Sequence, residues 1–265
     1  MTDAPVLLPP TPAAAPQKRY WGFWATVGLG AAVLLVFFVV QLLVILVAGI
    51  ALSMPELDQS LNTQDIVDRV MDALNARLGL LQSIATIASG ILGTGLILLF
   101  IRARRRADVQ EYLGVNSLSL KSILVSVVTV IGLIAVFDGL AWWLGYSSGG
   151  GIVADVYNTS IWPPLFWIAV VVFAPLFEEA FFRGFLFAGF RQSPLGAAGA
   201  VALTALAWAL MHALQYSLFS IGWIFVLGVA IGTVRHKTGS IWSAFIMHAL
   251  VNFIATLSLA MNWNI

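Results

Sequence analysis

The sequence contains no cysteine and few charged residues. Its 265 residues include 13 Lys and Arg and 12 Asp and Glu, so 9% of the chain is charged. Without cysteine the chain forms no disulfide, iron–sulfur cluster or cysteine-bound zinc site. Soluble domains carry about 25% charged residues, and 9% is too little to cover a water-exposed surface of this size. The formal net charge of +1 offers no broad basic surface for nucleic acid.

Apolar residues are abundant instead. They make up 60% of the chain, which has 17 Phe and 10 Trp, and the mean hydropathy is +0.96. Disordered chains are poor in such residues, so disorder is excluded as well as an ordinary soluble enzyme. A helix crosses the hydrocarbon core with about 20 apolar residues. The composition therefore predicts an integral membrane protein with an all-α fold, a polytopic bundle of transmembrane helices.

The apolar runs predict about seven spans, with six to eight as the acceptable range. Residues 1–19 are polar and rich in proline, and are predicted to form a disordered cytoplasmic tail. Residues 20–158 are predicted to form an N-terminal transmembrane region of about three spans with charged loops, one of which includes a short amphipathic helix within 55–77. Residues 159–265 are predicted to form a second region. The predicted spans cover residues 21–54, 78–101, 122–144, 161–190, 196–219, 222–234 and 240–261.

The distribution of basic residues predicts the orientation. Lys and Arg collect in cytoplasmic loops. Eleven of the 13 lie in segments on the same side as the N-terminus, and two, Arg69 and Arg77, lie on the other side. We therefore expect the N-terminus to be cytoplasmic.

A few ionisable residues within the apolar C-terminal half need a reason. A charge at the centre of a membrane helix costs about 2.5–3.5 kcal/mol on insertion scales, so such residues usually pair or serve function. Glu179 and Arg183 are four residues apart, which is a favourable ion-pair spacing on one helix face. Glu178 points about 100° away and has no local partner. An unpaired buried carboxylate suits a general base.

Two further pairs follow at helical spacing. Trp208 lies one turn before His212, and His248 lies one turn before Asn252. A single intramembrane histidine more often makes a helix–helix hydrogen bond than a catalytic contact. Two histidines, an asparagine and a glutamate pair on three predicted helices favour a site, with a purely structural polar network as the alternative. Asp138, within 122–144, is explained by helix packing or a position near the boundary.

Taken in order, the motifs Glu178-Glu179-x-x-x-Arg183, Trp208-x-x-x-His212 and His248-x-x-x-Asn252 resemble those of the CPBP intramembrane proteases. That family is also called CAAX-protease or Abi, and it usually has Phe where this chain has Trp208. The resemblance covers roughly residues 160–260. It implies a protease core over 159–265, a helical bundle with a polar cavity open to the membrane, and hydrolysis of a peptide bond there.

Two mechanisms are implied by the resemblance. In the first, Glu178 and His212 activate water, while His248 and Asn252 donate hydrogen bonds to the oxyanion; Glu179, Arg183 and Trp208 support the site. In the second, which would make the protein a metalloprotease, Glu178, His212 and His248 hold zinc, although no His-Glu-x-x-His motif is present. The first mechanism is favoured, and zinc stays open as a cofactor.

The same residues leave two alternative functions open. A non-catalytic immunity or binding protein would keep the polar network as a scaffold. A proton-coupled transporter would use it as a proton path, although the repeats that transporters often show are not visible. The expected partners are membrane lipid and a membrane-associated or lipid-linked peptide, without nucleic acid. The oligomeric state is not predicted, and the expected location is a bacterial inner membrane.

Straight spans would place Glu178, His212 and His248 at different depths in the bilayer. Helices broken around a polar cavity are tolerated in membranes. We therefore predict either that the fourth span ends near the glutamates, with residues 183–193 forming a re-entrant or interfacial piece, or that the fifth span begins later than residue 196.

Overall fold

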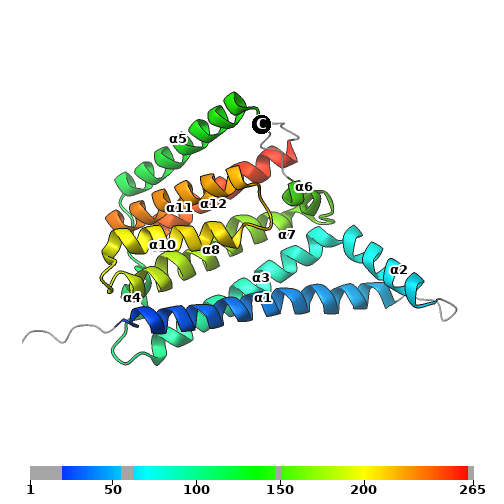
Figure 1. Cartoon of the computed structure of the whole chain (residues 1–265), viewed down its shortest axis with the longest axis horizontal. Helices are drawn as coiled ribbons and strands as arrows, with labels where there is room; N and C mark the ends of the chain where they lie inside the picture. Colours follow the sequence, from blue (N-terminus) through cyan, green and yellow to red (C-terminus); the bar gives the residue numbers. More distant parts are fainter. Residues whose placement is uncertain (1–19, 55–61, 147–150, 262–265) are drawn as a thin grey trace, which may run out of the picture.

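The computed structural model describes residues 20–54, 62–146 and 151–261, so the predicted tail at 1–19 lies outside the described residues. Within these ranges every regular element is a helix, which confirms the all-α prediction (Figure 1). The helices outside the fourth span are α1 Phe23–Ser53, α2 Thr63–Ala76, α3 Leu78–Ala103, α4 Val109–Leu113, α5 Leu120–Leu144, α6 Gly151–Asn158, α10 Gly196–Met211, α11 Leu218–Thr238 and α12 Ile241–Ala260.

In the described part of the chain six helices are long and apolar enough to cross a membrane, which indicates an integral membrane protein. They are α1, α3, α5, the helix over 163–190, α11 and α12. Six lies within the predicted range, and the remaining predicted span, the fifth at 196–219, corresponds to the shorter α10. At 1.5 Å per residue its 16 residues extend about 24 Å, less than the hydrocarbon thickness of about 30 Å.

The predicted bounds of the fifth and sixth spans, 196–219 and 222–234, are wrong. Helix α10 ends at Met211, and α11 is longer than predicted at both ends, since it begins at Leu218 and ends at Thr238. The start of α11 is set by Ser217, whose side chain accepts a hydrogen bond from the backbone N–H of Ser220, as N-cap serines do.

The fourth span is one continuous helical path over 163–190 with two π-helical segments. Its parts are α7 Pro163–Trp167, η2 Ile168–Phe173, α8 Ala174–Glu178, η3 Glu179–Leu186 and α9 Phe187–Phe190. The span therefore does not end near the glutamates, and residues 183–190 are not re-entrant. Helix α10 begins at Gly196, which is the predicted start of the fifth span and not a later one, so both predicted breaks are wrong. The span stays helical throughout but includes two π-helical segments, which have more residues per turn than an α-helix. These segments change which residues face each neighbouring helix.

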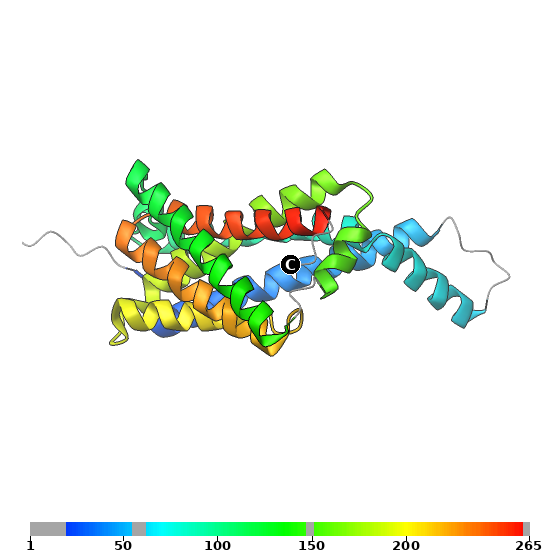
Figure 2. The same cartoon turned by 90° about the horizontal axis from the view of Figure 1, so that it is seen from above.

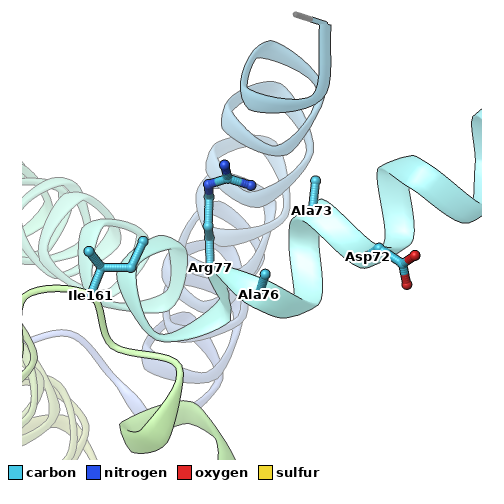
Figure 3. A pocket seen from close by; sticks show the side chains of 5 residues that line it. All are labelled: Asp72, Ala73, Ala76, Arg77 and Ile161. Atoms are coloured by element: carbon cyan, nitrogen blue, oxygen red, sulfur yellow. The ribbon is translucent and has the colours of Figure 1, made fainter. Parts of the chain in front are cut away.

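The N-terminal helices flank this span. Helices α1 and α3 pack against each other, and α2 projects away from the bundle in both views (Figures 1 and 2). Asn62 caps α2, which is the amphipathic helix expected within 55–77. An open hollow lies where α2 meets α3 (Figure 3), away from the predicted site residues. It is lined by Asp72, Ala73, Ala76, Arg77 and Ile161.

The segment between α4 and α5 fixes the start of α12. The backbone N–H of Ile241 donates to the Gly114 carbonyl at 2.8 Å, and the Asn116 side chain donates to the Gly239 carbonyl at 2.9 Å. The buried Arg235 guanidinium donates to the Leu113 carbonyl at 3.0 Å. Since α12 carries His248 and Asn252, these bonds from the N-terminal half help to place two predicted site residues.

Candidate active site

A buried ion pair lies at the centre of the site. Arg183 Nη1 donates to Glu179 Oε1 at 3.0 Å, and both side chains are only 1% exposed. The second Arg183 terminal nitrogen donates to the Gly228 carbonyl of α11 at 3.4 Å. Residues four apart in a helix lie on one face, so the contact forms within the fourth span and also ties that span to α11.

His248 lies between the two glutamates. Its Nδ1 is 2.8 Å from Glu179 Oε1, and its Nε2 is 3.9 Å from Glu178 Oε2. Glu179 Oε1 thus faces both Arg183 and His248, and the carboxylate orients the histidine ring. Helix α12 and the fourth span meet here through side chains separated by 69 residues.

Trp208 joins the glutamates to both histidines. Its indole N–H donates to Glu178 Oε2 at 2.5 Å. Its ring lies edge-on to His248 and to His212, with centroid separations of 5.0 and 5.4 Å. The Arg183 guanidinium carbon lies 4.5 Å from the Trp208 ring centroid, a cation–π distance. The phenylalanine usual in the family could fill this space but could not donate to Glu178.

His212 occupies the C-terminal end of α10. Its Nδ1 lies 2.9 Å from the Trp208 carbonyl, and because a carbonyl only accepts, Nδ1 must carry the hydrogen. Within the described residues it has no hydrogen bond to Glu178 or His248. The structure therefore brings Glu178, Trp208 and His248 into contact, while His212 reaches them through the Trp208 ring.

Asn252 lies one turn beyond His248 on α12. Its side-chain nitrogen donates to the Val170 carbonyl in η2 at 2.9 Å. A carboxamide nitrogen has two hydrogens, so one further donor remains for another acceptor.

Tyr216 is a neighbour of the site that the motifs did not reveal. Its ring centroid lies 6.0 Å from that of His212. The residue keeps 39% of its surface exposed, yet burial of the phenol, followed by the negative charge of Glu178, raises the pKa of Tyr216 above its ordinary value. The spacing of four residues after His212 was the signal that could have identified it.

The zinc alternative needs three grouped ligands. In the part of the chain that the structure describes, no three His, Asp or Glu side chains are grouped so that they could hold a metal ion. Glu178 and His248 approach each other, but His212 contacts Trp208 and Tyr216 instead. The three predicted ligands therefore do not fit a zinc ion as they are placed.

Some buried polar atoms of the site have hydrogen-bond partners and others have none. Glu179 Oε2 and Arg183 Nε are buried without a hydrogen-bond partner in the described residues. Glu178 is 8% exposed, Glu179 1% and His248 3%. The arrangement therefore holds one carboxylate against Trp208 and His248, and holds a second carboxylate in an internal pair. Such an arrangement can accept a proton at Glu178.

Part of the chain matches a known protein family. Residues 160–254 match the family described as Rce1-like, type II CAAX prenyl endopeptidase Rce1-like. The matched stretch coincides with the part that carries the three motifs, and it confirms the resemblance to the CAAX-protease family. The match indicates an intramembrane endopeptidase and therefore a hydrolase. Comparison with curated proteins and with solved structures gave no match.

Proposed function

We propose that Glu178 and His212 activate a water molecule that cleaves a peptide bond in a membrane-associated or lipid-linked peptide. The observation that carries this proposal is the buried Glu178 carboxylate, held by the Trp208 indole and 3.9 Å from His248, inside the stretch that matches the endopeptidase family. His248 and Asn252 act as hydrogen-bond donors to the oxyanion.

The hydrogen bonds of the histidines support the proposed roles. His212 carries a hydrogen on Nδ1, so its neutral ring offers a lone pair at Nε2 that can accept from water. In His248, Nδ1 faces a carboxylate, which only accepts when ionised. Its Nε2 can donate to an oxyanion only when the ring carries both hydrogens, so the proposed role requires the imidazolium form at that step.

The proposed reaction balances without a co-reactant other than water. Glu178 takes one proton as the water oxygen bonds to the carbonyl carbon, and the carbonyl oxygen becomes negative. Donors placed where charge develops lower the barrier. The proton then passes from Glu178 to the amide nitrogen as the carbon–nitrogen bond breaks, and an acid and an amine leave.

Zinc remains a second proposal for the same residues. It receives less support because the three ligands are not grouped, and no step above depends on it. Elemental analysis of the purified protein tests it: about one zinc per chain, lost in both His212→Ala and His248→Ala, would favour the metal mechanism.

Cleavage by purified protein tests the proposal. Protein in detergent or in liposomes is incubated with membrane peptides, chosen by mass spectrometry of membranes from cells with and without the gene. Wild type should cleave, whereas Glu178→Ala and His248→Ala should be inactive although they still insert in the membrane. A fully active Glu178→Ala variant would remove the catalytic proposal. Proton uptake without cleavage would favour a transporter, and binding without cleavage an immunity protein.

The proposed setting is a bacterial inner membrane with the N-terminus in the cytoplasm. The basic residues support this orientation, because eleven of the 13 lie in segments predicted on the same side as the N-terminus. Reporter fusions at residue 1 and after residue 61 should report opposite sides. Reporters on the same side would overturn the orientation.

A further inference from the structure

The π-helical segment η2 lacks one backbone donor because of a proline. The backbone N–H of Ala174 donates to the Ala169 carbonyl, five residues earlier, which is π-helical spacing. The next bond in this series would run from residue 175 to the Val170 carbonyl. Residue 175 is proline, which has no backbone N–H, so the helix cannot supply that donor.

Asn252 supplies it from another helix. Its side-chain nitrogen lies 2.9 Å from the Val170 carbonyl oxygen, across 82 residues of sequence. Backbone carbonyls inside a membrane need a partner within the protein, because lipid offers no donor. The carboxamide of α12 therefore occupies the position in which a helix N–H would otherwise lie.

We infer that Pro175 is a positioning residue for Asn252, because it leaves the Val170 carbonyl open to the carboxamide. The Val170 carbonyl takes one hydrogen of the Asn252 amide and prevents the reversed orientation, in which two oxygens would face each other. The second hydrogen is then held in a fixed direction. This inference rests on the proposed function only for what the second hydrogen does; the pairing of Pro175 with Asn252 is independent of it.

The test is a double-mutant cycle between Pro175→Ala and Asn252→Ala, measured by thermal unfolding of the purified, detergent-solubilised protein. Pro175→Ala gives residue 175 an N–H that can bond to Val170. Asn252→Ala alone leaves that carbonyl unpaired and should lower the unfolding midpoint by about 3–8 °C. In the Pro175→Ala background the same change should lower it by less than about 1 °C.

Pro163→Ala is the matched control. Pro163 lies in the first turn of α7, where the N–H has no helix partner anyway. In this background Asn252→Ala should lower the midpoint as much as in wild type. Equal losses from Asn252→Ala in the wild-type and Pro175→Ala proteins would overturn the inference.

Cleavage by the double variant separates the inference from the proposed function. If the double variant is as stable as the Pro175→Ala protein but does not cleave, the pairing of Pro175 with Asn252 and the oxyanion role of Asn252 are both supported. If stability and cleavage both return, the pairing is supported and the oxyanion role is withdrawn. The cycle in unfolding midpoints decides the inference in either case.

Discussion

Helices α1 and α5 of the N-terminal region differ from the fourth span in how many of their residues are buried. In their apolar windows 17% of the residues of α1 and 11% of those of α5 are buried, compared with 50% for the span over 163–190. The first two mainly present apolar side chains outward, while the span over 163–190 packs on several helices and encloses ionisable groups. The windows of α1 and α5 also have a higher mean hydropathy than that of the span over 163–190, so the higher hydropathy accompanies the lower burial.

The polar residues of the two regions differ in the same way. In the N-terminal helices Gln41 bonds to Ser89 and Gln82, both at 3.3 Å, and all three groups are neutral. In the C-terminal helices the buried polar contacts include carboxylates and a guanidinium. Neutral hydrogen-bonded pairs hold helices together with a small desolvation penalty, whereas buried charges need partners of opposite charge. The predictions below therefore pair a change in the C-terminal region with a similar change elsewhere.

The largest difference should come from two carboxylates within membrane helices. Glu178→Gln removes the proposed base and should reduce the turnover number by about 10²–10⁴-fold. Asp138→Asn, the same chemical change in α5, should leave turnover within a factor of two. Turnover of both variants is measured in liposomes. Equal losses of turnover in the two variants would show that Glu178 has no special catalytic role compared with a carboxylate of the N-terminal region.

Next in size is the loss of the buried ion pair. Glu179→Gln leaves the Arg183 charge buried without its partner, which costs about 3–5 kcal/mol and should lower the unfolding midpoint by about 10 °C. Asp68→Asn is the control, because Asp68 accepts an exposed hydrogen bond from Gln64 in α2. It should shift the midpoint by less than about 2 °C, and similar shifts for the two variants would contradict this account.

A smaller effect is expected at the indole that contacts the base. Trp208→Phe keeps the aromatic ring but removes the donor to Glu178. A hydrogen bond to a charged group is worth about 1.5–3 kcal/mol, and this one holds the Glu178 carboxylate in place. Without it the base is less well positioned, so kcat should fall about tenfold or more with little change in KM. Trp142→Phe in α5, where the residue is 84% exposed, should change neither constant. A fully active Trp208→Phe would show that the indole donor does not matter.

The smallest effect concerns pH and a buried phenol of the N-terminal half. Burial raises the pKa of Tyr112 from 10.0 to about 12. Between these values the folded protein keeps the proton and the unfolded chain releases it, so stability is full below pH 10 and falls as pH rises towards 12. Tyr112→Phe should remove the loss of stability that this phenol causes between pH 9 and pH 11, measured as the difference between the unfolding midpoints at the two pH values. An unchanged fall would contradict the assignment.

The sequence allowed the number of spans and the neighbours along each helix to be predicted, because these depend on local composition and spacing. The end of α10 at Met211 was not predictable, since Leu214 and Tyr216 continue the apolar pattern past it. Pro175 within a helical run predicts a kink or a break, and only the structure distinguishes these from a π segment. The Trp208–Glu178 contact depends on the depths of two helices, which composition does not determine.

The ion pair within the fourth span bears on the order in which the protein is made. Glu179 and Arg183 neutralise each other inside one helix, so a nascent chain ending near residue 190 already has both partners. Glu178 finds its donor Trp208 only 30 residues later, and His248 later still. When the ribosome has synthesised the fourth span, Glu178 is therefore the one carboxylate of that span without its partner. Its hydrogen bond forms only after the following helices have been made.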